Sequence, residues 1–400
     1  MGIDPVYVIG TCDTKESELA YACACIRAAG ARAVLVDVGT GAPGVAPDVS
    51  AAEVAACHPE GANAVLEGTD RGQAVAAMAV ALTHWLLARA DIGAVLGLGG
   101  SGNTALVTQA MRALPVGVPK LMVSTVASGQ VAPYVGASDV GMVYSVTDIA
   151  GLNAISRRVI GNAAHAAAGM ALNPVPVAKD DPPGLGITMF GVTTECVTHL
   201  RKLLDDTFEP YVFHATGTGG AAMEKLADSG LLAALLDVTA TEVADYLVGG
   251  VMPCSADRYG APARTGLPWV GSVGAVDMVN FGARDTVPER FAGRQFLVHN
   301  PQVTLMRTTP EENTAIGQFI AQRLNQCNGP VSLFLPLGGV SAIDVPGMPF
   351  HDPAADAALF TAIRKTFLVT ENRRLTELSL PINDPAFAAA MAAEIRRMTP

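Results

Sequence analysis

The sequence predicts an α/β protein with two Rossmann-like, doubly wound domains whose sheets are mainly parallel. Three observations support this prediction. Apolar runs of strand length, such as 6–10 and 93–98, are continuous rather than alternating, which is typical of parallel strands buried on both faces. Longer stretches with a helical period lie between these runs. The same alternation starts again after a segment rich in proline and charge, at 172–186.

In the first half, short apolar runs alternate with helical stretches. The helix predicted over 14–30 ends at Gly30, because glycine readily adopts the backbone conformation that closes a helix. A second helix is predicted over 103–114, directly after a glycine-rich turn. The predicted strands of this half are 6–10, 31–39, 93–98 and 119–125.

The segment 172–186 is predicted to be a linker, because prolines, charges and glycines cluster there. We therefore expect a nucleotide-binding domain at 1–180 and a second α/β domain, for a substrate or a partner, at 181–400. The stretches that begin at 8 and at 188 share a strand, a threonine-containing turn, a helix, a strand and Gly-Thr-Gly. A duplication and a chance likeness of two βαβ units both explain this. The predicted strands of the second half are 186–191, 209–217, 232–238, 302–308 and 331–336, with helices between them and a pair of helices at the end.

Composition and charge exclude several classes of protein. Half of the residues are hydrophobic and 16% are charged, so the chain can bury a large core. A net charge of −11 without a long basic run argues against a nucleic-acid partner. The longest uncharged helical stretch, 72–88, contains Gln73, Thr83 and His84, which favours a buried helix over a membrane span. Seven cysteines without a CxxC pair, and no visible signal peptide, predict a cytoplasmic protein.

Turns that follow strands are the candidate ligand sites, because open α/β sheets bind ligands beyond the carboxyl ends of their strands. In the turn GTCDTKE, 10–16, a helix N-terminus with unpaired amides suits an anion, and Lys15 adds a positive charge. Ordinary capping of the helix by Asp13 or Thr14 explains the same residues. Asp37 ends the next strand, where a carboxylate accepts ribose hydroxyls. The candidate binding residues of the first turn are Thr11, Asp13, Thr14 and Lys15.

The stretch LGLGGSGNT, 96–104, has the Gly-x-Gly-x-x-Gly spacing of the dinucleotide fingerprint. That fingerprint requires an acidic residue about 20 positions further on, and the strand 119–125 has none. No Gly-Lys-Ser/Thr follows either, so the stretch is not a Walker A loop. We interpret it as a cradle for a phosphate or a carboxylate. The candidate residues of this stretch are Gly99, Gly100, Ser101, Gly102, Asn103 and Thr104. The stretch STVASGQ, 124–130, adds the candidates Thr125, Ser128 and Gly129. A simple hydroxyl-rich turn also explains the residues of STVASGQ.

Four residues of the second half are candidate catalytic residues: His214, Glu242, His299 and Arg307. If strand ends bring them together, they form a cleft with an acid or base and an anion-binding arginine, suited to a carboxylate or a phosphate. A simpler explanation is also open, because Glu242 at a helix start favours the helix dipole and a lone histidine is commonly a satisfied polar residue. No histidine or cysteine spacing indicates zinc, and we predict no metal ligands.

Taken together, GTCDTKESEL, GLGGSGNT, STVASG and RRVIGNAA in the first half, with FHATGTGGAAMEKL, DVTATEVADYLVGGV and HNPQVTLMRTTPEE in the second, form a set of family-specific motifs. With them the chain resembles the family of the N-terminal ATP-binding domain of the plant tomato mosaic virus resistance protein and its bacterial and fungal relatives of unassigned function. The resemblance covers nearly the whole chain. It implies two Rossmann-like subdomains, ATP in the first of them, and dimers.

The resemblance further implies that the three turns of the first half line the ATP site, with Asp37 as a weaker contributor. In the plant protein a TIM-barrel domain follows, whereas in bacteria that domain is usually a separate protein. We therefore expect an ATP-binding homodimer that works with a separate TIM-barrel partner, with Mg²⁺ as an open option. The alternative is an ATP-dependent enzyme, a ligase or a kinase, that acts on a small carboxylate in an interdomain cleft.

Overall fold

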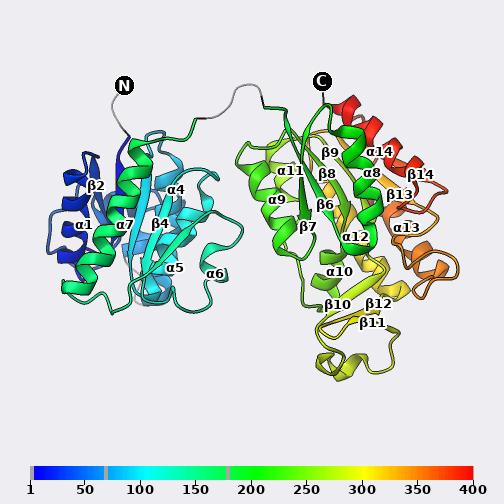
Figure 1. Ribbon diagram of the computed structural model, residues 1–400, viewed down its shortest axis with the longest axis horizontal. Helices are drawn as coiled ribbons and strands as arrows, with labels where there is room; N and C mark the ends of the chain where they lie inside the picture. Colours follow the sequence, from blue (N-terminus) through cyan, green and yellow to red (C-terminus); the bar gives the residue numbers. More distant parts are fainter. Residues whose placement is uncertain (1–3, 67–70, 177–180, 400) are drawn as a thin grey trace. The chain divides into compact units, whose positions relative to one another are not determined.

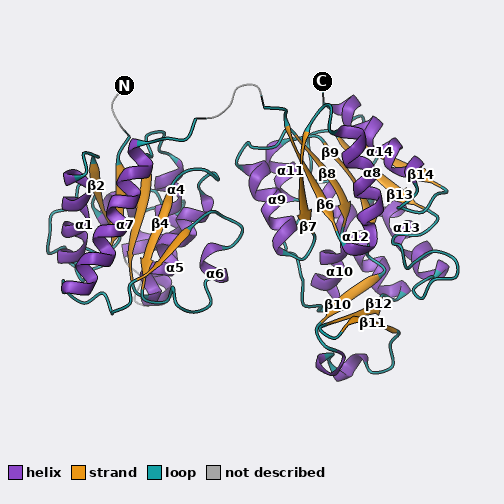
Figure 2. Cartoon of the chain, viewed as in Figure 1, coloured by secondary structure: helices purple, strands orange, loops and turns teal. Residues whose placement is uncertain are grey.

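The computed structural model describes residues 4–66, 71–176 and 181–399. They form two compact units, unit 1 (Met1–Ala178) and unit 2 (Lys179–Pro400), which are described separately (Figure 1). Both units are α/β structures whose main sheets are parallel (Figure 2). The predicted fold class, two Rossmann-like doubly wound domains with mainly parallel sheets, is therefore confirmed.

Unit 1 is built on a five-stranded parallel sheet with the order β2-β1-β3-β4-β5. Helices α1 (Glu16–Ala28) and α7 (Ala154–Leu172) pack together on one face. Helices α4 (Arg71–Leu87) and α5 (Ser101–Ala113) pack together on the other face. The strands are β1 (Val6–Gly10), β2 (Ala33–Asp37), β3 (Ala94–Gly99), β4 (Lys120–Ser124) and β5 (Gly141–Tyr144), and the short helices are α2 (Ala51–Ala55), α3 (Asn63–Leu66) and α6 (Ala132–Val135).

Small residues bring the helices of unit 1 close to its sheet. A Cβ atom on Gly97 of β3 would lie 2.8 Å from Cγ1 of Val107, so α5 packs directly over this glycine. On the other face, α7 presents a buried row of small side chains that includes Ala163, Ala164 and Ala167. Short helix-to-sheet distances of this kind explain why the chain is rich in alanine and glycine and poor in aromatic residues.

Unit 2 has a six-stranded parallel sheet with the order β14-β13-β9-β8-β6-β7. Helices α8 and α14 cover one face, and α9 to α13 cover the other. The strands of this sheet are β6 (Gly184–Met189), β7 (Glu209–His214), β8 (Ala234–Thr239), β9 (Trp269–Gly274), β13 (Val331–Pro336) and β14 (Arg373–Leu378). The helices are α8 (Thr194–Leu204), α9 (Thr218–Asp228), α10 (Thr241–Val248), α11 (Gly260–Thr265), α12 (Pro310–Leu324), α13 (Pro353–Thr366) and α14 (Pro385–Met398).

A second, antiparallel sheet is inserted in unit 2 between β9 and β13. It has the order β10-β12-β11, with β10 (Met278–Phe281), β11 (Phe296–Asn300) and β12 (Val303–Arg307). The strand predicted at 302–308 therefore exists as β12, but it is not part of the main sheet. A short apolar run looks the same in either kind of sheet, so the sequence pattern could not separate the two.

Two strands of the main sheet, β9 and β14, are absent from the sequence prediction. The residues of β14 are half-buried or exposed and include Arg373, Arg374 and Glu377. This strand forms the edge of the sheet, where charged side chains remain in water and no continuous apolar run is needed. The pattern that identifies buried parallel strands therefore fails for it.

The two main sheets share one strand order. Numbered along the chain within each unit, it is 2-1-3-4-5 in unit 1 and 2-1-3-4-5-6 in unit 2. In this doubly wound arrangement, the ligand crevice lies at the carboxyl ends of the first and third strands. These strands are β1 and β3 in unit 1, and β6 and β8 in unit 2.

The chain has two tryptophans, Trp85 in α4 and Trp269 in β9, so the unfolding of each unit can be followed separately. Each apolar cluster contains residues of one unit alone. We therefore expect Ile26→Ala, at a fully buried site of α1, to destabilise unit 1 by about 2–5 kcal/mol and to leave unit 2 unchanged. Urea unfolding of the Trp85→Phe and Trp269→Phe variants, followed by fluorescence, measures both transitions.

Met391→Ala in α14 is the matched variant for unit 2, and it is expected to shift the Trp269 transition alone. The prediction is wrong if Ile26→Ala shifts the Trp269 transition as much as the Trp85 transition.

Candidate functional site

Four chain segments follow the strands of unit 1 at the carboxyl edge of its sheet. Each begins where its strand ends, and all four strands run parallel, so the segments share one edge (Figure 1). We name them the β1 turn (11–15), the β2 loop (38–45), the β3 turn (99–103) and the β4 turn (125–129).

The pairing of the strands brings the ends of neighbouring strands, and so the starts of these segments, to the same level of the sheet. Gly10, the last residue of β1, pairs with Asp37 of β2, and Gly99, the last residue of β3, pairs with Ser124 of β4. Strands β1 and β3 are neighbours, and the helices that follow them, α1 and α5, lie on opposite faces of the sheet. The crevice between the β1 turn and the β3 turn is therefore the crevice that the strand order predicts.

The β3 turn presents a bare helix N-terminus to solvent. Gly100 is the N-cap residue of α5 and has no side chain with which to cap it. Ser101 and Gly102, the first two residues of α5, are exposed, and a Cβ atom on Gly102 would have nothing within 4 Å. Since the first amides of a helix have no intrahelical partner, these groups are open to an anion.

The side chains of two predicted binding residues of this turn point into the protein and not toward solvent. The amide of Asn103 donates to the carbonyl oxygen of Leu98. The buried hydroxyl of Thr104 lies 2.8 Å from the carbonyl oxygen of Gly100 and 2.7 Å from Oγ of Ser124. The expectation that Asn103 and Thr104 contact the ligand is thus corrected, because their side chains hold the turn in shape.

The β1 turn begins α1 in a similar way. Lys15 is the N-cap residue, and no side-chain hydrogen bond caps the helix. The hydroxyls of Thr11 and Thr14 lie 2.7 Å apart, with Thr14 exposed and Thr11 half-buried. Asp13 accepts a hydrogen bond of 3.0 Å from the backbone amide of Gly41, which fastens the β2 loop to this turn.

Asp37 does not face the crevice as a free carboxylate. It is buried, and its Oδ1 atom accepts the backbone amides of Cys12 at 2.9 Å and Gly39 at 2.8 Å. These two bonds hold the start of the β1 turn and of the β2 loop together. The predicted role of Asp37 toward a ribose is therefore corrected to a role in shaping the turn.

The β4 turn contributes exposed groups next to the β3 turn. Ser128 and Gly129 are exposed, and Thr125 is half-buried. Ser124 accepts the backbone amide of Val126 at 3.1 Å as well as contacting Thr104, so it joins the β4 turn to α5. Ser124 is not among the residues predicted from the sequence, although a hydroxyl at the end of a buried strand is a recognisable signal.

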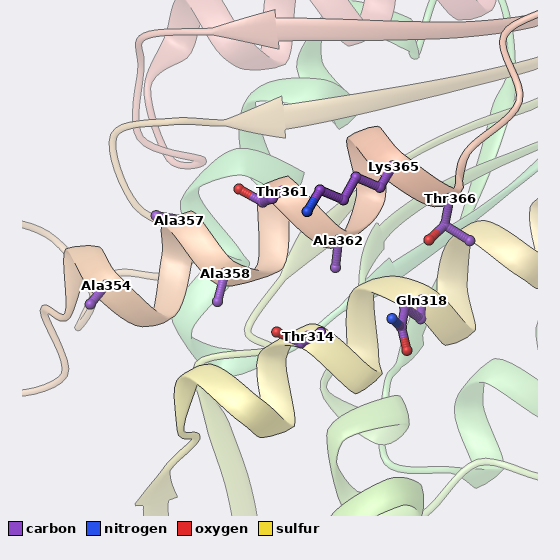
Figure 3. A pocket seen from close by; sticks show the side chains of 9 residues that line it. All are labelled: Thr314, Gln318, Ala354, Ala357, Ala358, Thr361, Ala362, Lys365 and Thr366. Carbon is purple, nitrogen blue, oxygen red and sulfur yellow. The ribbon is translucent and has the colours of Figure 1, made fainter.

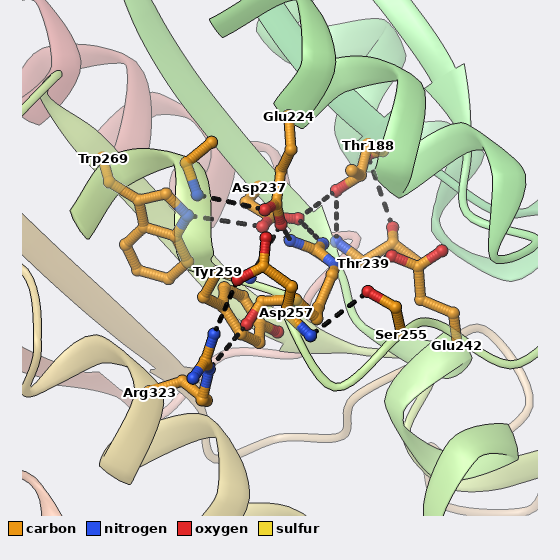
Figure 4. A network of polar contacts seen from close by, with 12 residues as sticks. Thr188, Glu224, Asp237, Thr239, Glu242, Ser255, Asp257, Tyr259, Trp269 and Arg323 are labelled. Carbon is orange, nitrogen blue, oxygen red and sulfur yellow. Dashed lines mark hydrogen bonds and ion pairs between the residues drawn. The ribbon is translucent and has the colours of Figure 1, made fainter. Parts of the chain in front are cut away.

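In unit 2, Glu242 belongs to a buried ionic cluster centred on Arg258. Figure 4 shows the carboxylates of this cluster, Glu224, Asp237 and Glu242. The guanidinium of Arg258 contacts Glu242 at 2.5 Å, Glu224 at 2.8 Å and Asp237 at 2.7 Å. Burial raises the pKa of the Glu224 and Glu242 carboxyls, and the charge of Arg258 opposes this rise. Glu242 also accepts the backbone amide of Gly217 at 2.8 Å, at the start of α9. A substrate cannot reach this carboxylate without breaking the cluster.

The crevice position of unit 2 is filled by the protein itself. The hydroxyls of Thr193 and Thr239, which lie after β6 and at the end of β8, are 2.8 Å apart and fully buried. Thr188 of β6 donates to Asp237 of β8 at 2.7 Å. The two units therefore share a strand order, but at this position of unit 2 the buried threonine hydroxyls contact one another, and the exposed turn residues after β6 are Gly191 and Thr194.

Arg307 is also buried, in a second cluster. Its guanidinium contacts Asp344 at 3.1 Å and Asp356 at 3.0 Å, and its Nε atom donates to the carbonyl oxygen of Phe350 at 2.8 Å. Burial raises the pKa of Asp277 and of Asp344 to about 6, and burial together with Asp344 raises that of Asp356 to about 7, although Arg307 opposes each shift. Arg307 therefore stabilises the interior and is not open to an anionic substrate.

The two histidines lie in two further places. His214, at the end of β7, is exposed and stacks on Phe190 with 5.0 Å between the ring centres. His299 is exposed on β11 of the small antiparallel sheet. Within the part of the chain that the structure describes, no hydrogen bond or ion pair joins any two of the four predicted catalytic residues. The predicted convergence of His214, Glu242, His299 and Arg307 is therefore not found.

A hollow on unit 2 lies between α12 and α13 (Figure 3). These helices pack closely, since a Cβ atom on Gly317 would lie 2.8 Å from the carbonyl oxygen of Leu359. No predicted site residue lines the hollow. Its lining residues are Thr314, Gln318, Ala354, Ala357, Ala358, Thr361, Ala362, Lys365 and Thr366.

Neither a metal cluster nor a membrane helix is found in residues 4–66, 71–176 and 181–399. No three His, Cys, Asp or Glu side chains there are arranged to hold a metal ion. No helix of these segments is both long and apolar enough to cross a membrane. The apolar helix predicted at 72–88 is α4, which buries Met78, Leu82 and Trp85 against the sheet of unit 1.

Removing Arg258 should strongly destabilise unit 2. Arg258→Leu leaves three buried carboxylates without their cation, and we expect a loss of about 3–5 kcal/mol in the free energy of unfolding. Arg264→Leu is the matched control, because Arg264 is half exposed and its ion pairs with Asp228 and Asp257 are worth about 0–1 kcal/mol. Denaturant unfolding followed through Trp269 compares the two, and equal losses would contradict the structural role of the cluster.

The stability of unit 2 should depend on the protonation of Asp356. Because the pKa of Asp356 is about 7 in the folded state, the folded chain keeps a proton that the unfolded chain loses near the ordinary aspartate pKa. The protonated Asp356 side chain therefore contributes its full share to the free energy of unfolding below the ordinary aspartate pKa. This contribution is lost as the pH rises through about 7. We expect the free energy of unfolding to fall from about pH 5 to about pH 8, and Asp356→Asn to flatten this slope. A slope that is the same in the variant would refute the assignment.

The comparisons with known proteins identify the family. Models of the uncharacterised protein family UPF0261 match residues 4–175 with its N-terminal domain and 183–399 with its C-terminal domain. A UPF0261 protein of Rhizobium meliloti (strain 1021) is 56% identical over 391 residues, which cover 98% of each chain. A UPF0261 protein of Clostridium tetani is 42% identical over 398 residues, again 98% of each chain.

A plant protein is similar as well. The ToMV resistance protein Tm-1(GCR237) of Solanum lycopersicum is 40% identical over 420 residues, which cover 99% of this chain and 56% of that protein. Among solved structures, a UDP-N-acetylglucosamine 2-epimerase from Rickettsia bellii matches with 11% identity and a TM-score of 0.23, over 98% of this chain and 96% of the epimerase chain. The chain belongs to the UPF0261 family, which confirms the resemblance drawn from its motifs.

Proposed function

We propose that unit 1 binds ATP in the crevice between the β1 turn and the β3 turn. The observation that supports this most directly is the bare N-terminus of α5, where Ser101 and Gly102 are exposed and no side chain fills the space beside Gly102. Backbone amides of this kind bind phosphate groups, and the helix dipole adds attraction for negative charge.

The surrounding groups suit the rest of a nucleotide phosphate chain. Lys15 at the start of α1 supplies a positive charge, and the hydroxyls of Thr11 and Thr14 are hydrogen-bond donors on the same side of the crevice. Ser128 and Gly129 of the β4 turn border the other side. Hydroxyl groups and a lysine around two helix N-termini favour a phosphate ester over an apolar ligand.

Mg²⁺ is compatible with this proposal. It is usually bound through one or two carboxylates together with the phosphates of the nucleotide. Asp13 of the β1 turn fits that need, because its Oδ1 atom is buried without a hydrogen-bond partner in the described part of the chain, while Oδ2 accepts the amide of Gly41. Asp13 would hold the ion, whose charge would offset that of the phosphates.

The role we propose for the nucleotide is to support binding of a partner, a separate TIM-barrel protein, by a homodimer of this chain, as the resemblance implies. The alternative function, an ATP-dependent ligase or kinase that acts on a small carboxylate, depended on catalytic groups in the second half. Glu242 and Arg307 are bound within the interior of unit 2, so no observation favours the alternative.

Gly102→Asp tests the proposed site. The new side chain has free space, and a carboxylate at the second position of α5 favours the helix dipole, so the variant should fold as stably as the native chain. Its charge should repel the phosphates and weaken ATP binding by about tenfold or more. Isothermal titration calorimetry with ATP, with and without Mg²⁺, measures the change.

Gly102→Asn is the matched control, with the same size and no charge. It is expected to bind ATP far better than Gly102→Asp. The proposal fails if the native chain binds no ATP, or if the Asp and Asn variants bind ATP equally well.

A further inference from the structure

A hollow of about 460 Å³ lies on unit 1 between α5 and the segment that leads into α6. We name it the α5–α6 hollow. Its volume is in the range of small-molecule sites. It is lined by two glutamines, an aromatic ring, an arginine and two small residues: Gln109, Gln130, Tyr134, Arg112, Ala105 and Pro133.

The α5–α6 hollow is connected to the proposed phosphate site along α5. Ser101, Ala105 and Gln109 are spaced by four residues, so they lie on one face of the helix, and all three are exposed. At 1.5 Å of rise per residue, Gln109 lies about 12 Å along the axis from Ser101. A ribose and a phosphate chain separate a nucleotide base from its outer phosphates by a similar length.

A second connection runs through the β4 turn. Gln130, which lines the hollow, directly follows Ser128 and Gly129, which border the phosphate site. The hollow therefore adjoins the proposed site on two sides, once through α5 and once through this turn.

The wall of the α5–α6 hollow is fixed before any ligand binds. Nη1 of Arg112 donates to the carbonyl oxygens of Pro133 at 3.0 Å and Tyr134 at 2.8 Å. The backbone of α6 is closed by a hydrogen bond of 2.8 Å from Gly136 to Ala132. A preformed wall lowers the entropic cost of binding a rigid, planar group.

The lining chemistry suits a purine. Each glutamine amide has two donor hydrogens and an acceptor oxygen, a set that matches adjacent acceptor and donor groups on the edge of a base. Tyr134 supplies an aromatic face on which a base stacks. Neither an aspartate nor a glutamate lines the hollow, so its polar groups are neutral except for the bonded arginine.

We infer that the α5–α6 hollow holds the purine base of the nucleotide whose phosphates the N-terminus of α5 binds. This inference rests on the proposed function and adds the part of the site that selects the base. Tyr134 stacks on the ring, the amides of Gln109 and Gln130 bind its edge, and Ala105 leaves room for the ribose.

The experiment compares three probes on the full chain: ATP, CTP and inorganic triphosphate. Competition titrations give their dissociation constants. ATP should bind about tenfold more tightly than CTP, because the larger ring stacks over more area. Ala105→Trp, which fills the hollow, and Tyr134→Ala, which removes the aromatic face, should each weaken ATP binding about tenfold and leave triphosphate binding unchanged.

Gln109→Ala is a third variant on the exposed face of α5, and it keeps the test valid if Tyr134→Ala does not fold. It should weaken ATP binding severalfold without affecting triphosphate. The matched controls are Gln318→Ala and Tyr211→Ala, exposed residues of unit 2 that should change nothing.

The possible outcomes separate the two claims. If neither ATP nor triphosphate binds the native chain, the proposed function fails, and the inference falls with it. If ATP binds and the hollow variants bind it as well as the native chain does, or ATP and CTP bind equally, the inference alone is overturned. It is also overturned if the hollow variants lose triphosphate and ATP to the same extent.

Discussion

The parallel pairing of β1 with β3 is the constraint on which the rest of unit 1 depends. The chain leaves β1 toward β2 on one side and leaves β3 toward β4 on the other side, so right-handed crossover connections place the helices that follow β1 and β3 on opposite faces. Helices α1 and α5 accordingly leave the sheet in opposite directions, and their N-termini remain on either side of a crevice. The polar turns, the bare amides of α5 and the α5–α6 hollow all follow from this geometry.

Unit 2 repeats the strand order and uses its crevice differently. There the turns are closed by threonine hydroxyls, and carboxylates that follow strands or begin helices are drawn into clusters around Arg258 and Arg307. Each cluster places several carboxylates around one guanidinium, so burial acts against the charged forms and raises the pKa of most of these groups. Such clusters hold distant segments of the chain together, and within them the carboxylates and guanidinium groups are bonded to one another.

The predictability of the site differed from residue to residue for physical reasons. The run of glycines after a buried strand predicted a turn at 99–102, and the structure has Gly100 half-buried as the N-cap of α5 with Ser101 and Gly102 exposed; their binding to a ligand stays a prediction. Asn103 and Thr104 also have polar side chains, but within the first turn of a helix successive side chains can point to solvent or to the interior. The side chains of Asn103 and Thr104 point to the interior and bond to the protein. Ser124 and Arg258 were missed as partners, since their contacts involve residues that are 16 to 34 positions away in the sequence.

The sequence by itself determined the two-unit α/β fold, most of the parallel strands, and the turns that lie at the carboxyl edge of unit 1. These features follow from local composition and period, which each segment carries independently of the others. Only the tertiary structure decided that β12 belongs to an antiparallel sheet, that Asp37 binds backbone amides, and that Glu242 and Arg307 are buried with partners. The reason is physical: whether a polar side chain is free for a ligand depends on which distant charges and amides fold against it, and no local pattern records that.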